Sequence, residues 1–230
     1  MPYDADPLPP RPDSAFWFGA YPAIVRDIED PDGQARIRVA LPGVPDANGA
    51  GYEAWARTAT LFAGNNRGSL FMPDPGDEVL VIFQGGDPRL PVVIGGLWNG
   101  RDAPPTRPDR SNRTKMIRSR NGVKVTLDDS DGREQFVCET PGGQKITLKD
   151  GPGGVKIADS NGNSIELAPA GITLTASAKL TISASTVEIS AGMVSVSSGM
   201  SRFSGVVQAD TVISNTVISS TYTPGAGNIW

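Results

Sequence analysis

The sequence predicts an all-β protein in which a small N-terminal barrel precedes an intertwined β-helix shared by several chains. The 230 residues include 27 glycines and 20 prolines, and aromatic residues make up only 7%, a composition rich in turns. Strand-like segments with short connections crowd residues 21–98. From residue 144 to 220, aliphatic pairs recur with one residue between the two members, which places both members on one face of a strand.

The aliphatic pairs define seven short strands. Their centres lie 9, 10, 7, 8, 7 and 7 residues apart, which leaves room only for a turn between strands. Each repeat supplies two inward side chains, so one chain cannot close a core, whereas three copies around a shared prism can. An ordinary antiparallel meander within one domain is the alternative. The pairs are Ile146/Leu148, Val155/Ile157, Ile165/Leu167, Ile172/Leu174, Leu180/Ile182, Val187/Ile189 and Val194/Val196.

Charge and hydropathy exclude several classes of protein. The formal net charge is −4 and the pI is about 4.9, which argues against general nucleic-acid affinity and against a basic membrane-binding patch. The longest clean apolar run, residues 79–83, is too short to span a bilayer, and the N-terminus lacks the order of a signal peptide. We therefore expect a soluble protein made in the cytoplasm. The single cysteine, Cys138, excludes an intrachain disulfide and favours a packing role.

The motifs for catalysis and metal binding are weak. The chain has no histidine, which removes Ser-His-Asp and Cys-His catalysis and histidine-ligated zinc or iron. Residues 128–132 and 159–163 superficially resemble calcium loops, but the alignment places Leu127 and Ile157 at the first ligand position. No Gly-Lys-Ser/Thr phosphate loop is present. We predict no enzyme activity, no cofactor and no metal site.

The N-terminal residues 1–18 predict an extended arm that ends in aromatic residues. Residues 1–14 carry five prolines and four charges and cannot bury a core. Phe16, Trp17 and Phe18 follow directly. Aromatic residues dominate both cores and interfaces, so these three either plug the base of the barrel or dock on a partner.

Residues 19–100 predict the barrel. The turn at residues 30–33 joins two strands into a hairpin, and residues 42–51 and 64–68 are expected as loops, the second of them mobile. A closed barrel leaves no exposed edge strand. The expected strands cover residues 23–28, 35–41, 55–61, 79–83 and 91–97.

The rest of the chain divides into a charged linker with prolines (residues 101–114), a shaft (115–221) and an apex segment (222–230). Charge falls along the shaft, and its outer face is expected to be rich in hydroxyl groups. The charged residues after Leu167 are Lys179, Glu188, Arg202 and Asp210.

The barrel segment resembles the OB-fold of phage baseplate assembly protein V, the family of central spikes in contractile tails, to which the valine-glycine repeat spike of type VI secretion is related. The similarity rests on Gly76-Asp77-Glu78-Val79, Gly86-Asp87-Pro88 and Pro91-Val92-Val93-Ile94-Gly95. Residues 23–25, 36–39 and 55–57 match the earlier strands of that fold, and residues 122–129 and 162–167 are similar to its β-helix. The resemblance also includes the closing residues 222–230.

This resemblance implies a homotrimeric spike of the virion tail baseplate that punctures the host outer envelope on sheath contraction and plugs the tail tube. It implies a separate hub protein, contacted by Phe16, Trp17 and Phe18, and a tip where Ile229 and Trp230 either cap the prism or carry a PAAR-type tip protein. Several spikes of the family end in a histidine-ligated iron, which a chain without histidine cannot build. A β-helical tail fibre that binds a receptor or degrades glycans is the alternative function. The expected shaft core is Ile165, Leu167, Ile172, Leu174, Leu180, Ile182, Val187 and Ile189.

Overall fold

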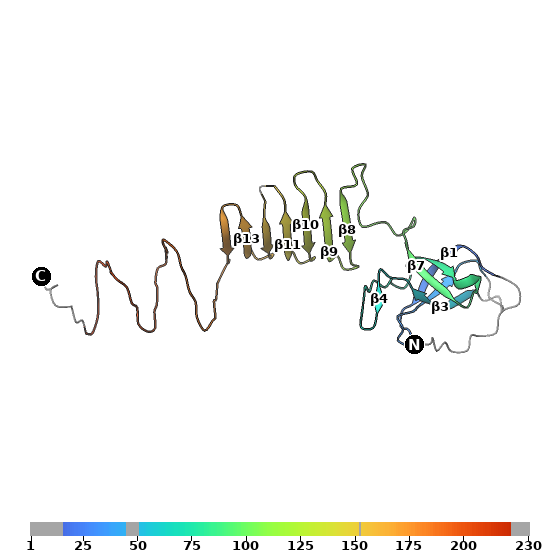
Figure 1. Cartoon of the computed structure of the whole chain (residues 1–230), viewed down its shortest axis with the longest axis horizontal. Coiled ribbons are helices and arrows are strands. Elements are labelled where there is room, and N and C mark those ends of the chain that lie inside the picture. The colour runs from blue at the N-terminus through green and yellow to red at the C-terminus, as the bar shows by residue number, and fades with distance from the viewer. Residues whose placement is uncertain (1–15, 45–50, 152, 222–230) are drawn as a thin grey trace. The chain divides into compact units, whose positions relative to one another are not determined.

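The computed structural model describes residues 16–44, 51–151 and 153–221 (Figure 1). Over these residues the regular structure is fourteen β-strands and one short 3-10 helix, η1 (Gln84–Gly86), which confirms the all-β class. None of the described residues forms a helix that is long and apolar enough to cross a membrane. The described residues up to Lys179 form one compact unit and those from Leu180 onward a second, and each is described by itself.

Five strands close into the predicted barrel. They are β1 (Ala20–Asp27), β2 (Ile37–Leu41), β3 (Tyr52–Thr58), β6 (Glu78–Phe83) and β7 (Pro91–Leu97), and they pair in the order β1-β2-β3-β7-β6. Neighbours are antiparallel except β3 and β7, which run parallel. This is the five-stranded Greek-key arrangement of the OB-fold. Every strand has two partners, so the barrel has no free edge.

The barrel core follows from alternation along the strands. In β6 the side chains of Val79, Val81 and Phe83 are buried, while the residues between them are partly exposed. Successive side chains of a strand point to opposite faces, so each strand lines the interior with every second residue. The buried cluster is Ala23, Val25, Ile37, Val39, Leu41, Ala56, Val79, Val81, Phe83 and Val93.

The turn between β1 and β2 is organised by Asp30. Its carboxylate accepts hydrogen bonds from the backbone N–H groups of Asp32, Gln34 and Arg36, and from the guanidinium of Arg36, whose terminal nitrogen lies 2.6 Å from Oδ1. The Asp30 side chain is only 3% exposed. The bonds from the Arg36 side chain hold the pKa of this carboxyl well below its usual range, although burial opposes the shift. Asp30 therefore stabilises the β1–β2 hairpin, the first hairpin of the barrel.

The expected mobile loop at residues 64–68 is instead a second hairpin, formed by β4 (Ala63–Gly64) and β5 (Arg67–Gly68). Its turn needs Asn66 in the left-handed region, with φ 54°, which asparagine tolerates. The Ser69 N–H donates to the Phe62 carbonyl at 3.1 Å, so the ladder continues beyond the two strands. A Cβ at position 68 would lie 3.0 Å from that carbonyl, so glycine permits the close approach.

Residues 114–175 form one seven-stranded antiparallel sheet in which each strand pairs with the next along the chain. Glycine supplies positive φ in its tight turns, for example at Gly122 (89°) and Gly143 (86°). Within a single chain this is the topology of a meander, and the expected β-helix, which needs several chains, stays a prediction. The strands are β8 (Thr114–Arg118), β9 (Lys124–Asp128), β10 (Gln135–Glu139), β11 (Lys145–Lys149), β12 (Val155–Ala158), β13 (Ser164–Ala168) and β14 (Gly171–Thr175).

The second unit contains no strand or helix among its described residues, 180–221. The strands expected at Leu180/Ile182, Val187/Ile189 and Val194/Val196 are not formed in the single chain. A strand is stabilised by hydrogen bonds to a neighbour, and these residues have no β-pairing in one copy. Bends fall at residues 185, 192 and 199, and then at 205, 210, 215 and 220, so their spacing shortens from seven residues to five.

Candidate functional site

Two rows of apolar side chains cross one face of the β8–β14 sheet. Residues that pair directly in an antiparallel ladder lie on the same face, so the register fixes the membership of each row. In β12 and β13, for example, Ile157 pairs with Ile165 and Val155 with Leu167. The first row is Ile117, Val125, Cys138, Ile146, Ile157, Ile165 and Leu174, and the second is Lys115, Leu127, Phe136, Leu148, Val155, Leu167 and Ile172. We call these thirteen apolar side chains, with Lys115 excluded, the apolar face.

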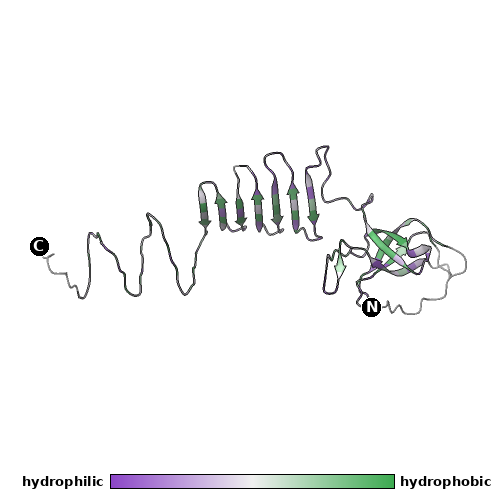
Figure 2. Cartoon of the chain, in the orientation of Figure 1, coloured by the Kyte–Doolittle hydropathy of each residue, from purple (hydrophilic) through white to green (hydrophobic). Residues whose placement is uncertain are grey.

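The apolar face is open to solvent in the single chain. Phe136 is 38% exposed, Ile157 47%, Leu174 51% and Ile172 74%. Figure 2 shows hydrophobic and hydrophilic bands alternating along these strands. A monomeric soluble protein rarely leaves a contiguous apolar surface of this extent uncovered. The face is therefore the candidate contact surface of this chain.

The opposite face of the sheet is mostly polar. Its central row runs from Met116 through Thr126, Val137, Thr147, Lys156 and Glu166 to Thr173. The Lys156 ammonium and the Glu166 carboxylate, on neighbouring strands, lie 3.0 Å apart with both side chains about half exposed. This chemistry suits contact with water, so the two faces of the sheet have different roles.

The structure divides the predicted shaft core into two groups. Ile165, Leu167, Ile172 and Leu174 lie on the apolar face. Leu180, Ile182, Val187 and Ile189 lie in the second unit, where they are 55%, 68%, 57% and 70% exposed and no strand orders them. The predicted tip residues, Ile229 and Trp230, lie outside the described residues.

The three aromatic residues before β1 differ in their surroundings. Trp17 packs at the end of the barrel core with Tyr21, Tyr52 and Phe83, and its ring centroid lies 5.0 Å from those of Tyr52 and Phe83. The backbone N–H of Trp17 donates to the carbonyl of Gly86 at 2.8 Å. Trp17 thus plugs the barrel, which was one of the two predicted roles.

Phe16 and Phe18 remain largely outside that core. Their rings stack with centroids 5.7 Å apart, and they are 60% and 73% exposed. A Cβ added at Gly86 would lie 3.0 Å from the Phe18 ring, so this glycine lets the two rings sit against the β6–β7 turn. The pair offers an apolar contact surface, and its role as a hub contact stays a prediction.

The β6–β7 turn that supports these aromatic residues is held by polar contacts. The guanidinium of Arg89 binds the buried carboxylate of Asp87 through two nitrogens, at 3.0 and 2.6 Å. The Tyr52 hydroxyl donates to the carbonyl of Pro88 at 2.5 Å. Burial, reinforced by the nearby Asp87 carboxylate, raises the pKa of Tyr52, so the phenol remains a hydrogen-bond donor. These contacts stabilise the turn.

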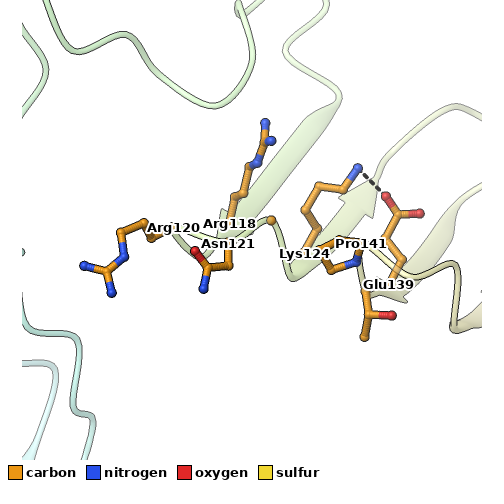
Figure 3. A pocket seen from close by; sticks show the side chains of 8 residues that line it. Arg118, Arg120, Asn121, Lys124, Glu139 and Pro141 are labelled. Atoms are coloured by element: carbon orange, nitrogen blue, oxygen red, sulfur yellow. Dashed lines mark ion pairs between the residues drawn. The ribbon is translucent and has the colours of Figure 1, made fainter.

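A groove lies beside the β8–β9 and β10–β11 turns (Figure 3). Figure 3 shows the ion pair between the Lys124 ammonium and the Glu139 carboxylate, on neighbouring strands. Lys124 is the main cause that lowers the pKa of Glu139, which is unsuited to act as a general acid near neutral pH. The lining residues are Arg118, Arg120, Asn121, Gly122, Lys124, Glu139, Thr140 and Pro141.

No group of three or more potential metal ligands from His, Cys, Asp and Glu occurs within residues 16–44, 51–151 and 153–221. The Asp128 and Asp159 loops, which superficially resemble calcium loops, use their carboxylates locally. Asp128 accepts from Ser130 and Gln135, and Asp159 accepts from Asn161 and Asn163. Hydrogen bonds from Ser130 and Asn163 are the largest causes that lower the pKa values of the two carboxyls. Both loops are turns stabilised by their own side chains.

Sequence reasoning missed one group of exposed apolar residues, around the β4–β5 hairpin. Leu61 is 90% exposed, Phe62 59%, Leu70 75% and Phe71 68%. The signal in the sequence is one apolar pair on each side of a Gly-Asn-Asn turn, a pattern that indicates a hairpin.

Comparison with known families accounts for both parts of the chain. Residues 21–98 match the type VI secretion system/phage-baseplate injector OB domain. Residues 135–200 match the phage baseplate V C-terminal trimerisation domain, which includes most of the sheet and the start of the second unit. The first match agrees with the closed barrel, and the second falls on the segment that carries the apolar face.

Curated relatives support the same assignment. The type VI secretion system spike protein VgrG1c of Pseudomonas aeruginosa is 28% identical over 113 residues, which are 46% of this chain and 16% of that protein. VgrG4b of the same species is 33% identical over 114 residues, with 46% and 14% covered. The actin cross-linking toxin VgrG1 of Vibrio cholerae is 28% identical over 111 residues, with 46% and 10% covered. The matched segment thus spans less than a fifth of each relative, and the two domain matches together assign this chain to the phage baseplate V family.

Proposed function

We propose that three copies of this chain pack their apolar faces together into a closed prism and that the trimer is the central spike of a contractile-tail baseplate. The observation that carries the proposal is the pair of apolar rows on a single sheet, with no second layer over them among the described residues. A match to a trimerisation domain over residues 135–200 supports threefold assembly in particular.

Burial of the apolar face supplies the driving force for assembly. Removing a Leu, Ile, Val or Phe side chain from water contributes roughly 1.5–3 kcal/mol, and thirteen apolar side chains lie on this face. A sheet in one chain cannot bury its own face, whereas three sheets facing a common axis bury all three. The second unit then gains strand partners from the other copies, so residues 180–221 order only in the trimer.

The function that follows is mechanical. Contraction of a tail sheath would drive the trimer forward, and a shaft with a fully paired backbone transmits compression without exposing unsatisfied N–H or C=O groups. In this role the spike punctures the outer envelope of the host and plugs the tail tube before contraction. No catalytic group is required, and the spike would reside in the virion tail baseplate.

Two further contacts complete the proposal. The stacked rings of Phe16 and Phe18, together with the turn at Gly86, would bind a separate hub protein at the tube end of the spike. Ile229 and Trp230 would form an apolar platform for a small tip protein of the PAAR-repeat kind, or else cap the prism themselves.

The mass of the protein in native solution tests the proposal. We expect a trimer of the 24.1 kDa chain that resists dissociation on dilution. Ile172→Asp should abolish the trimer because it would bury three carboxylates about one axis. Thr173→Asp is the matched control, since Thr173 lies on the opposite face of the same strand.

The two variants separate assembly from simple destabilisation. Ile172 and Thr173 are both exposed in one chain, so a monomeric protein would tolerate both substitutions equally. A stable monomer in the unmodified protein, or a trimer that persists in Ile172→Asp, would contradict the proposal.

A further inference from the structure

The β4–β5 hairpin carries exposed apolar residues on both of its sides. Successive residues of an extended ribbon point in opposite directions. Leu61 and Phe62 therefore face opposite sides on one arm, and Leu70 and Phe71 do so on the other arm. All four are more than half exposed.

The ladder assigns each residue to a side. The register pairs Ala63 with Gly68, and the bond from Ser69 to Phe62 continues it by one step. Thr60 and Ser69 join their hydroxyl groups at 2.5 Å, which places them on one side together with Phe62 and Phe71. Alternation beyond the paired residues assigns Leu61 and Leu70 to the other side. The hairpin thus has an aromatic side and an aliphatic side.

A two-stranded hairpin that is apolar on both sides needs an apolar surface packed against each side. One partner docked on one side would leave two large apolar residues in water on the other. The only formal charge between residues 60 and 71 is Arg67, at the turn, so no charged partner is indicated for the sides of the stem. The binding partner must therefore supply two different apolar surfaces, one for each side of the hairpin.

We infer that the occupant is a second copy of this hairpin, so that three hairpins form a closed ring in which the aromatic side of each one packs on the aliphatic side of the next. A heterologous contact of this kind repeats from copy to copy, and it closes when the number of copies matches the rotation. Three copies fill all six sides. The inference rests on the proposed threefold assembly and adds to it a contact made by the OB domain itself.

The ring accounts for details that a flexible loop would not need. Gly68 permits the close approach to the Phe62 carbonyl, and Asn66 adopts the left-handed backbone that the tight turn requires. The hydroxyl groups of Thr60 and Ser69 form a hydrogen bond with each other, so they need no hydrogen-bonding partner from another chain. Such a stem can lose water on both sides at low cost.

Cysteine cross-linking tests the ring. In a Cys138→Val background, the paired change Leu70→Cys with Phe71→Cys places one thiol on each side of the hairpin. With a short bismaleimide, the ring predicts covalent trimers of the isolated protein on a denaturing gel. Either single variant should give no cross-linked trimer, because each copy then has a thiol on one side only. Glu29→Cys with Gln34→Cys is the matched control, at exposed positions in the β1–β2 turn.

The outcomes separate the ring from the trimer itself. Covalent dimers without trimers would indicate a twofold contact and would overturn the ring. A protein of trimeric native mass with no cross-link would also overturn it, because the hairpins would then lie apart or bind a different protein, while the proposed spike would stand. A monomeric mass would contradict the spike first. Phe71→Ser gives a second readout, for which we expect easier dissociation of the trimer with an intact barrel.

Discussion

The barrel and the shaft sheet are both antiparallel β-structures of short strands, yet only the barrel completes a core within one chain. In the barrel each strand has two neighbours, and ten buried side chains fill the interior. In the shaft sheet most side chains of the apolar face are 38–74% exposed, and the buried Val137 lies on the opposite face. The difference lies in closure, since a sheet that curls on itself buries one face whereas an open sheet needs another layer.

This contrast shows that alternation alone does not determine whether a chain can fold by itself. The barrel strands carry enough inward residues, and they are connected so that the first strand meets the last. The shaft strands pair only with their sequence neighbours, so the sheet ends at β8 and β14 with one open face. In consequence, the barrel completes its core within one chain, and in the proposed trimer the stability of the shaft would depend on protein concentration.

The largest expected effect breaks the shaft and spares the barrel. Ile182→Asp should eliminate the ordered trimer of the shaft, since three carboxylates in a dry core cannot all ionise. Hydrogen exchange by mass spectrometry should then show rapid exchange from β8 onward and unchanged protection in β1, β2 and β6. Thr181→Asp, one residue earlier on the outward side, should behave like the unmodified protein. Loss of protection in the barrel as well would show that the two parts fold as one unit.

A substitution in the barrel core should weaken the barrel and leave the shaft trimer intact. Ile37→Ala removes a side chain that is 0% exposed, and a cavity of this kind costs about 2–5 kcal/mol in the free energy of unfolding. Denaturant titration followed by tryptophan fluorescence should show the barrel transition at lower denaturant, with trimeric mass retained below it. Ile94→Ala, at a position 45% exposed, should change the transition far less. Dissociation of the trimer in native buffer would argue against independence.

Acid should act on the barrel through Asp30. The folded-state pKa of this carboxyl is lowered, so its stabilisation is complete above the unfolded-state pKa of about 3.9 and is lost as the pH falls below that value toward the folded-state pKa. Asp30→Asn should cost about 2 kcal/mol of barrel stability at pH 7, through weaker charge-assisted hydrogen bonds. The gap between the two proteins should narrow in acid. A constant gap from pH 7 to pH 2 would contradict this role.

The smallest expected effect comes from the outward face of the shaft. Lys156→Ala removes an ion pair whose side chains are 50% and 45% exposed, and pairs of this kind contribute about 0.2–1 kcal/mol. Trimer dissociation, measured by thermal melting, should shift slightly at low salt and not at all at high salt. An effect comparable with that of Ile182→Asp would mean that the polar face, and not the apolar face, holds the copies together.

The barrel could be predicted well because its strands find their hydrogen-bonding and packing partners within the same chain. The expected segments 35–41, 79–83 and 91–97 overlap β2, β6 and β7 closely. The third strand was expected at residues 55–61 but occupies Tyr52–Thr58. The chain bends at Leu61 to enter the β4–β5 hairpin, and the apolar pairs Leu61/Phe62 and Leu70/Phe71 are the signal of that hairpin in the sequence.

The strands of the shaft could be predicted only where the same chain supplies a neighbouring strand. The pairs from Ile146/Leu148 to Ile172/Leu174 lie on strands β11–β14, and the later pairs have the same spacing but no strand. Phe16, Trp17 and Phe18 show a related limit, because one ring enters the barrel and two stay outside. That division depends on where the β6–β7 turn lies in space, and three consecutive aromatic residues in the sequence do not predict that position.

The shortening of the bend spacing in the second unit, from seven residues to five, has a mechanical consequence for the proposed trimer. Coils of five residues enclose a smaller cross-section than coils of seven, so the assembled shaft would taper beyond residue 199. For a given load, pressure rises as the contact area falls, but the resistance of a column to buckling falls even more steeply with its width. A thin section is therefore useful only if it is short, and the five-residue spacing spans only the bends from 205 to 220. The repeat length in the sequence would thus set the balance between sharpness and stiffness.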